Sequence, residues 1–364
     1  MSAFGYYRVK IRVLAMVDCE NIKITHEVLA VISELDSFKA SWKLFGKLSP
    51  EKLSALKKVA TIESIGSSTR IEGVKLSDKE IEKLLSNIGS TSFLSRDEQE
   101  VAGYSEVCNL VFSFFEEMSF SENLIKQLHG VLLKFSEKDE RHSGEYKKLP
   151  NSVEAFDPSG KSLGIIFETA SPFDTPFQMQ DLMNWFKAQQ AEQKLHPLIL
   201  IGIFIVHFLA IHPFQDGNGR LSRVITTLLL MQFGYIYTPY SSLESIIEKN
   251  KENYYLSLRK TQATLKNEAD YEPWLLFFLR SLQKQKMHLE RKLELEKEAV
   301  IFNLSDLSRK IIDLIKERES VGISEITRLT GANKNTVKKH LSVLVKDELI
   351  VPYGSGKSTK YRVM

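Results

Sequence analysis

One twelve-residue stretch points most clearly to the architecture of this chain: His212-Pro213-Phe214-Gln215-Asp216-Gly217-Asn218-Gly219-Arg220-Leu221-Ser222-Arg223. Two glycines flank an asparagine, and glycine lets backbone N–H groups approach phosphate oxygens because no Cβ stands in the way. The apolar run that follows, Leu221 to Phe233, has helical spacing. The N-terminus of that helix would face the glycine loop, where orphan N–H groups and the helix dipole favour an anion. The stretch therefore predicts a polyphosphate site at the start of a helix.

The charged residues of the same stretch fit group transfer from a phosphate chain. Arg220 and Arg223 lie three residues apart on the first helical turn, so both guanidinium groups can reach one chain of phosphates. Asp216 is a candidate Mg²⁺ ligand, since magnesium prefers one or two carboxylates plus oxygens of the substrate. His212 suits the removal of a proton from a hydroxyl. Nucleotidyl and phosphoryl transfer need mainly positioning and charge neutralisation, which these residues supply.

The stretch resembles the signature of the Fic family, H-P-F-x-[D/E]-G-N-G-R-x-x-R, and departs from it at no fixed position. Members of that family mostly transfer AMP from ATP to a hydroxyl side chain of a target protein. The resemblance implies that His212 is the general base and that Asp216 holds Mg²⁺. It further implies nucleotide contacts by the loop residues and arginines: Gly217, Asn218 and Gly219 on the α- and β-phosphates, Arg220 on the β-phosphate and Arg223 on the γ-phosphate, with Phe214 as a buried anchor.

A second feature lies upstream, between Gly144 and Phe167, where two short runs of strand-forming residues flank the turn Asp157-Pro158-Ser159-Gly160. The pattern predicts a β-hairpin, with a surface loop as the alternative. Fic proteins carry a hairpin "flap" in this position, which covers the nucleotide and pairs with the target by β-augmentation. The resemblance favours a flap at 144–168, with Asn151 and Val153 as nucleotide contacts. Lys147 stands where the family often has arginine.

Downstream of the signature, Tyr254 and Tyr255 resemble the tyrosine pair that Fic proteins place near the nucleotide. The resemblance implies that Tyr254 contacts the nucleotide. Adjacent tyrosines on a helix are also common packing residues, and that alternative stays open.

A helix is expected from Pro50, which Ser49 caps, to about Gly73, a natural helix stop. Near its end, Ser68-x-x-x-Glu72-Gly73 resembles the inhibitory motif [S/T]-x-x-x-E-[G/N] of Fic proteins. A carboxylate of Glu72 paired bidentately with Arg223 would occupy the donors that hold the γ-phosphate and misplace the phosphates of ATP. The resemblance thus implies an autoinhibited enzyme, and it leaves open whether Glu72 also supports removal of AMP.

The C-terminal segment 303–364 resembles a winged helix-turn-helix, with three helices followed by strand, glycine loop and strand. It carries 12 Lys and Arg against 7 Asp and Glu, whereas the net charge of the whole chain is only +3. DNA contact and an interaction or dimerisation module are both compatible with this pattern. In the DNA interpretation, the contacts come from the expected third helix, 334–346: Lys334, Lys338 and Lys339 for phosphates, and Asn333, Asn335 and Thr336 for bases.

Composition supports a mainly α protein with a substantial core, since 43% of the residues are hydrophobic. The two cysteines, Cys19 and Cys108, exclude a disulfide framework and, with no signal peptide recognisable, suggest a cytoplasmic protein. The most apolar segment, Leu198 to Ile211, is too short for a membrane span and predicts a buried central helix. Helices are expected near 96–117, 122–135, 178–191, 197–211, 219–233, 245–262 and 271–300.

These observations predict a Fic-type helical core with a small hairpin flap and a C-terminal winged helix. The expected parts are an N-terminal helical region 1–95, a core 96–280, a helical connector 281–302 and the winged helix 303–364. The expected function is an autoinhibited protein adenylyltransferase that uses ATP and Mg²⁺ and modifies a Ser, Thr or Tyr hydroxyl of a target protein and of itself. The alternative is a DNA-binding transcriptional regulator that uses the core as a nucleotide sensor. Gly219 argues against a phosphorylating relative, which would usually carry lysine there; another nucleotide donor and a homodimer stay open.

Overall fold

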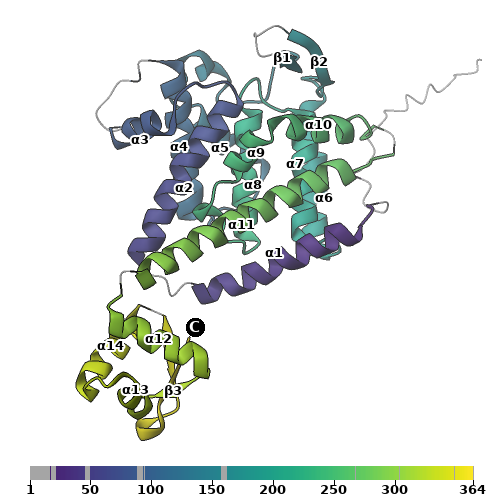
Figure 1. The fold of residues 1–364 in the computed structure, drawn as a ribbon. Helices are drawn as coiled ribbons and strands as arrows, with labels where there is room; N and C mark the ends of the chain where they lie inside the picture. The colour runs from purple at the N-terminus through teal and green to yellow at the C-terminus, as the bar shows by residue number, and fades with distance from the viewer. Residues whose placement is uncertain are drawn as a thin grey trace, which may run out of the picture. The chain divides into compact units, whose positions relative to one another are not determined.

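The computed structural model describes residues 17, 22–45, 50–87, 93, 95–156, 162–266, 268–302, 304–347 and 349–363. The chain divides into two compact units, one formed by residues 1–43 and 54–286 and the other by residues 44–53 and 287–364. Both are built mainly from helices (Figure 1), so the expected mainly α class is confirmed.

Eleven α-helices precede residue 303 in the described part of the chain. They are α1 (His26–Phe45), α2 (Pro50–Ile71), α3 (Asp78–Ser86), α4 (Arg96–Phe114), α5 (Glu122–Leu132), α6 (Thr175–Glu192), α7 (Pro197–Ile211), α8 (Asn218–Gln232), α9 (Leu243–Lys249), α10 (Lys251–Gln262) and α11 (Glu272–Phe302), with short 3-10 turns at η1 (Glu137–His142) and η2 (Thr238–Tyr240).

Helix α7 lies at the centre of the larger unit. It begins with Pro197, and the preceding His196 caps it by accepting a hydrogen bond at Nδ1 from the Leu198 N–H (3.3 Å). Nearly every side chain along α7 is buried, and α6, α8 and α10 pack around it. The prediction of a buried central helix is confirmed. Among the described helices, none combines the length and apolarity needed to cross a bilayer.

The expected hairpin is present as β1 (Ser152–Phe156) and β2 (Ser162–Glu168), paired antiparallel with Ser152 opposite Glu168. It extends from one end of the helical core, where α10 lies near β2 (Figure 1). The predicted turn at 157–160 lies outside the described residues. Residues 146–151 are not strand, so the hairpin starts later than the expected flap boundary of 144.

The prediction of a single helix over 245–262 was wrong, because the chain breaks at Asn250 into α9 and α10. Asn250 leaves the helical conformation at φ −122° and ψ 30°. Its side-chain Nδ2 donates to the Ile246 carbonyl at 2.7 Å, in place of a continued backbone ladder. The break sets the direction of α10, which carries Tyr254.

The smaller unit ends in three helices and a three-stranded sheet. The Gly331 turn between the second and third helices has φ 69°, a left-handed conformation that glycine adopts without strain. The expected order of helices and strands is present, with one short strand, β3, that the sequence pattern did not predict. The elements are α12 (Asp306–Arg318), β3 (Val321–Gly322), α13 (Ile323–Thr330), α14 (Lys334–Lys346), β4 (Ile350–Tyr353), η3 (Gly356–Ser358) and β5 (Lys360–Val363), with sheet order β3-β5-β4.

Candidate active site

The signature stretch forms a loop between the central helices α7 and α8. His212 terminates α7 in the left-handed region, with φ 53° and ψ 60°. Such a conformation is uncommon for a residue with a Cβ and is concentrated at functional sites. Gly217, at φ 81°, begins α8 in the same region without that strain. The two left-handed residues fold the loop back so that it runs across the N-terminus of α8.

The loop is closed by its own side chains. Asn218 accepts at Oδ1 from the Phe214 N–H (2.9 Å) and donates from Nδ2 to the Phe214 carbonyl (2.7 Å). Phe214 is fully buried, as expected of the loop anchor. Because both ends of the Asn218 amide bond to the backbone of Phe214, the Asn218 side chain holds the loop. A phosphate contact from this residue would come from its backbone N–H.

His129 of α5 joins the loop to the entry of the hairpin. Its ring stacks on Phe214 at a centroid distance of 3.8 Å. Nδ1 accepts from the Gly144 N–H (3.0 Å), so Nε2 carries the proton that is donated to the Asp216 carbonyl (3.0 Å). Burial lowers the pKa of His129 to about 4, which keeps the ring neutral and this pattern intact. The sequence pattern offered no sign of this role for a lone histidine in a helix.

His212 presents a neutral imidazole to the site. Its Nδ1 lies 3.2 Å from the Leu209 carbonyl, an arrangement in which Nδ1–H donates and Nε2 is left as the basic nitrogen. Burial lowers the pKa of His212 to about 4. At neutral pH the ring is therefore deprotonated, which is the form that a general base requires.

Lys147 fastens the start of the hairpin to the end of α7. The side chain is buried, and its Nζ donates to Asn151 Oδ1 (2.8 Å), Thr169 Oγ1 (3.0 Å) and the Ile211 carbonyl (3.0 Å). Burial lowers the pKa of Lys147 to about 8. Asn151 in turn donates to the Phe214 carbonyl at 2.8 Å. The Asn151 amide thus binds the signature loop in this structure. The side chain of Val153, the other predicted flap contact, lies outside the described residues.

Arg223, on the first turns of α8, is held by the C-terminal end of α2. Its Nε donates to Ser68 Oγ (2.7 Å), and its Nη2 donates to the Ser68 carbonyl (2.9 Å) and to Glu72 Oε1 (2.8 Å). The predicted pairing of Glu72 with Arg223 is present, but the bidentate geometry was wrong. Arg223 bonds to one carboxylate oxygen of Glu72, and Ser68 accepts from Nε and from the same Nη2. Gly73, at φ 108°, then ends this segment.

Gly219 lies directly under the Glu72 carboxylate. A Cβ at position 219 would overlap Glu72 Oε1. A lysine there would displace the carboxylate from Arg223, so the contact between α2 and α8 depends on the absence of a side chain at this position. The Glu72–Arg223 contact therefore requires glycine at position 219.

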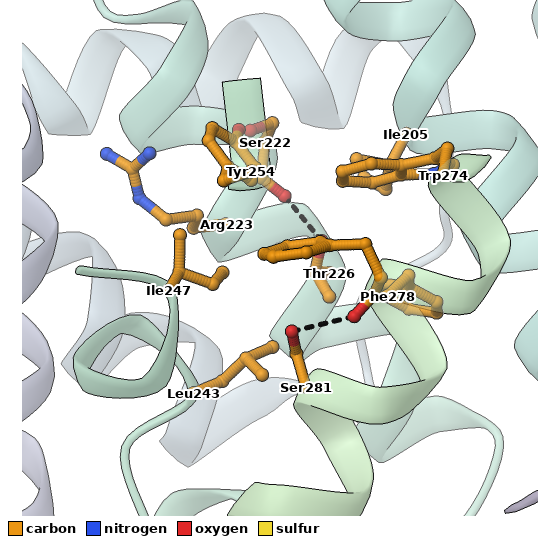
Figure 2. A pocket seen from close by; sticks show the side chains of 11 residues that line it. Ile205, Ser222, Arg223, Thr226, Leu243, Ile247, Tyr254, Trp274, Phe278 and Ser281 are labelled. Carbon is orange, nitrogen blue, oxygen red and sulfur yellow. Dashed lines mark hydrogen bonds between the residues drawn. The ribbon is translucent and has the colours of Figure 1, made fainter. Parts of the chain in front are cut away.

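A small cavity lies on the inner side of Arg223, between α8, α10 and α11 (Figure 2). Tyr254 and Trp274 line it, with ring centroids 5.9 Å apart. Thr226, in the cavity wall, donates to the Ser222 carbonyl at 2.8 Å. Arg223 Nη1 is buried and has no hydrogen-bond partner within the described part of the chain. Tyr254 is 4% exposed, so it packs beside the arginine predicted to hold phosphate.

Arg220 and Asp216 belong to an ionic network with α4. Asp216 Oδ1 accepts from the Gly217 N–H (2.6 Å) and lies 3.3 Å from Arg220 Nη2. Arg220 Nη1 lies 2.9 Å from Glu100 Oε2, and Arg96 Nε donates to Glu100 Oε1 at 2.7 Å. Burial works to raise the pKa of Asp216, but Arg220, the Gly217 N–H and Arg96 lower it more. The carboxylate is thereby held in its charged form. The sequence did not identify Arg96 or Glu100 as candidate site residues, because the residues of α4 match no functional motif.

The donor set around Asp216 fits Mg²⁺ only together with a nucleotide. Within the described residues, no group of three or more His, Cys, Asp or Glu side chains could hold a metal ion alone. The Asp216 side chain is 37% exposed, so one carboxylate faces outward beside the arginines. Magnesium commonly combines one such carboxylate with phosphate oxygens and water.

Comparison with known proteins agrees with this geometry. Residues 119–230, from just before α5 to near the end of α8, match the model of the Fic/DOC family. Two solved structures share the fold: a Fic family protein from Desulfovibrio desulfuricans (21% identity, 94% of this chain and 97% of that one, TM-score 0.59) and a Fic domain containing signaling protein from Bacteroides thetaiotaomicron (24% identity, 72% and 97%, TM-score 0.55).

The curated relatives include proteins named protein adenylyltransferase Fic. That of Drosophila grimshawi is 27% identical over 74% of this chain and 49% of its own length, and that of Drosophila yakuba 26% over 80% and 51%. The chain thus spans about half the length of these relatives. Signature, fold and comparisons agree, and residues 119–230 of the chain form a segment that matches the Fic/DOC family.

Proposed function

We propose that the chain is a protein adenylyltransferase that transfers AMP from ATP to a Ser, Thr or Tyr hydroxyl of a target protein and of itself. The observation that carries the proposal is the convergence at the N-terminus of α8 of a neutral His212, the glycine loop and the buried guanidinium groups of Arg220 and Arg223. The names of the curated relatives support the same reaction class.

In this mechanism His212 acts as the base. Its Nε2 takes the proton of the target hydroxyl, while the hydroxyl oxygen bonds to the α-phosphorus of ATP and pyrophosphate leaves. The loop N–H groups and Arg220 hold the phosphate chain, and Arg223 binds its terminal phosphate. Mg²⁺ on Asp216 would neutralise phosphate charge when bound. The hairpin β1–β2 would pair with the target segment by strand addition.

Glu72 is the proposed brake. Its carboxylate accepts from Arg223 Nη2, a donor that the terminal phosphate needs, and Glu72 directly follows α2, outside the matched Fic/DOC segment. ATP bound with its phosphates displaced by the carboxylate would be poorly aligned for attack. Removal of AMP by the same site is a separate activity that adenylylated protein as a substrate would test.

The test is intact-protein mass after incubation with Mg²⁺ and ATP, UTP or CDP-choline. One added AMP with ATP, increased in Glu72→Gly, supports the proposal. An added UMP or phosphocholine would instead identify UTP or CDP-choline as the donor in place of ATP. No adduct on the protein or on added protein substrates from any donor would favour the alternative, a nucleotide-sensing regulator.

The brake is held in place by Arg70, which lies two residues before it. Arg70 Nε and Nη2 donate to the two carboxylate oxygens of Glu248 in α9 (2.7 and 3.1 Å), and Nη1 donates to Asp78 (2.8 Å). Arg70→Ala should therefore loosen the end of α2 and raise self-modification partway to the level of Glu72→Gly. Initial rates of AMP incorporation measure this.

The matched control for that substitution is Lys58→Ala on the same helix. Lys58 pairs at 3.5 Å with Glu82, and both side chains are largely exposed, so such a pair contributes little. Self-modification should not change in Lys58→Ala. If the rate of self-modification rises equally in both variants, the stability of α2 and not the Arg70 contact accounts for the effect.

We also propose that the smaller unit binds DNA through α14. Val337, Leu341 and Leu344 of this helix are buried in the core of the unit, whereas Lys334, Lys338 and Lys339 are exposed. A helix that follows a tight turn and exposes three cations on one side is suited to the phosphates of a major groove.

Filter binding of the full chain to duplex DNA at several salt concentrations tests this proposal. Lys334→Ala/Lys338→Ala/Lys339→Ala should weaken binding and reduce the slope of log K against log[salt] by about 3, one for each lost phosphate contact. The control is Lys310→Ala, which alters an exposed lysine of α12. It should change neither the DNA affinity nor the salt slope strongly. An unaltered slope in the triple variant, or no binding by the wild-type chain, would leave a protein-interaction module as the function of this unit.

A further inference from the structure

Asp216 and three charged residues around it form a closed ring in which the signs alternate. Glu100 bridges Arg96 through Oε1 (2.7 Å) and Arg220 through Oε2 (2.9 Å). Asp216 closes the ring by facing Arg220 through Oδ1 (3.3 Å) and Arg96 through Oδ2 (3.6 Å). Two members come from α4 and two from the signature stretch. Residues of α4, outside the signature stretch, therefore contribute to the electrostatic environment of Asp216, the candidate metal ligand.

The ring has a buried half and an open half. The side chains of Arg220 and Glu100 are 2% and 8% exposed, whereas those of Arg96 and Asp216 are 57% and 37% exposed. The Arg96–Asp216 contact is also the longest of the four. Breaking the buried pair would strand a charge away from water at a high cost. The open pair is weak and exchangeable, as exposed ion pairs usually are.

Arg96 therefore lies beside the Asp216 oxygen that a metal cation would have to bind. Asp216 Oδ1 already accepts from the Gly217 N–H and faces Arg220, whereas Oδ2 faces the exposed Arg96. Glu100 keeps Arg96 in place, because the Arg96 Nε–Glu100 bond is independent of the Asp216 contact.

We propose that Arg96 is a built-in counter-ion of Asp216, and that Arg96 and the divalent cation that accompanies the nucleotide compete for Oδ2 of this carboxylate. The proposal rests on the proposed function, since it assumes that ATP binds beside α8. Without metal, Arg96 contributes a positive charge next to the phosphates. With metal, it is displaced from Asp216 and opposes the arriving cation.

The proposal predicts a specific change in how strongly Mg²⁺ promotes ATP binding. Arg96→Gln removes one positive charge, so ATP alone should bind more weakly while the metal meets less repulsion. The ratio of the Kd for ATP in EDTA to the Kd in saturating Mg²⁺ should rise on the order of tenfold, from Coulomb interaction of a single and a double charge about 5 Å apart in a solvated setting. Arg96→Lys keeps the charge and should leave the ratio within about twofold of the parent.

Isothermal titration of ATP into the full chain measures the two constants. The parent for all variants is Glu72→Gly/His212→Ala, in which the brake is removed and turnover is blocked. Lys134→Gln is the matched control, an exposed residue that pairs with Glu106 at 2.5 Å, and its ratio should equal that of the parent. Thermal unfolding of each variant establishes that it is folded.

The outcomes separate this inference from the function on which it rests. A raised ratio in Arg96→Gln, with Arg96→Lys and Lys134→Gln like the parent, supports competition at Asp216. The same ratio in Arg96→Gln and the parent overturns it, as does a raised ratio in Arg96→Lys equal to that in Arg96→Gln. Failure of the parent itself to bind ATP, with or without Mg²⁺, would count against the proposed function instead.

Discussion

Replacing Glu72 by glycine is expected to raise the initial rate of self-AMPylation on the order of 100-fold, the penalty associated with misplacement of reacting groups by about 1 Å. In the structure, Arg223 Nη2 lies 2.8 Å from the Glu72 carboxylate. Loss of that carboxylate returns the donor to the terminal phosphate and clears the space above Gly219. Incorporation of labelled AMP, followed over time at saturating ATP, measures the change.

Glu72→Gln is the informative companion to Glu72→Gly. Glutamine keeps the length of the side chain and an oxygen that accepts from Arg223, but it loses the negative charge that strengthens the bond. Its rate should fall between those of wild type and Glu72→Gly. If Glu72→Gly is no faster than wild type, Glu72 does not inhibit the enzyme, whatever its contact with Arg223.

His212→Ala in the Glu72→Gly background should lower AMP transfer by about 10² to 10⁴-fold, the usual contribution of a positioned base. The imidazole Nδ1 lies 3.2 Å from the Leu209 carbonyl, which leaves Nε2 to take the proton of the target hydroxyl. The Kd for ATP should change little, since the phosphates are held by the arginines and the loop. Rate and affinity measured on the same preparation separate the two effects.

The control for this substitution is His142→Ala, at the end of η1 and outside the signature stretch. Its transfer rate should match that of the Glu72→Gly parent. Full activity in Glu72→Gly/His212→Ala would exclude His212 as the base. A parallel loss of ATP affinity would indicate instead that the side chain supports the shape of the loop.

The pH dependence of the same reaction gives an independent check on His212. Burial lowers the pKa of this histidine from the usual 6.5 to about 4. The basic, neutral form therefore persists as the pH falls, and kcat/KM of Glu72→Gly should lose activity only as the pH approaches 4. A half-maximal value near 6.5 would mean that an ordinary, solvated histidine is the base.

Much of the candidate site could be predicted from sequence because its parts are local. The glycine loop, the buried Phe214 and the start of α8 follow from neighbours within twelve residues, whose turn and helix preferences act over that range. The end of α2 near Gly73 was predictable for the same reason. For β1–β2 the local pattern left a hairpin and a surface loop open, and the resemblance to the family favoured the hairpin that is present. The pairing of Glu72 with Arg223 came from resemblance to a family motif, since nothing in the local pattern relates residues 151 positions apart.

The mainly α class and the local shape of the signature loop thus follow from the sequence, which also points to Glu72 as the proposed brake. The side chains that surround that loop come from helix packing, which local sequence patterns do not specify. His129 and Glu100 reach Asp216 and Arg220 from separate helices, across sequence distances at which local preference carries no information. The single-oxygen pairing of Glu72 also depends on packing, since Ser68 lies against the same guanidinium, accepts from Nε and shares Nη2 with Glu72. Backbone preferences fix short segments, whereas partners for buried charges are fixed by how the helices pack.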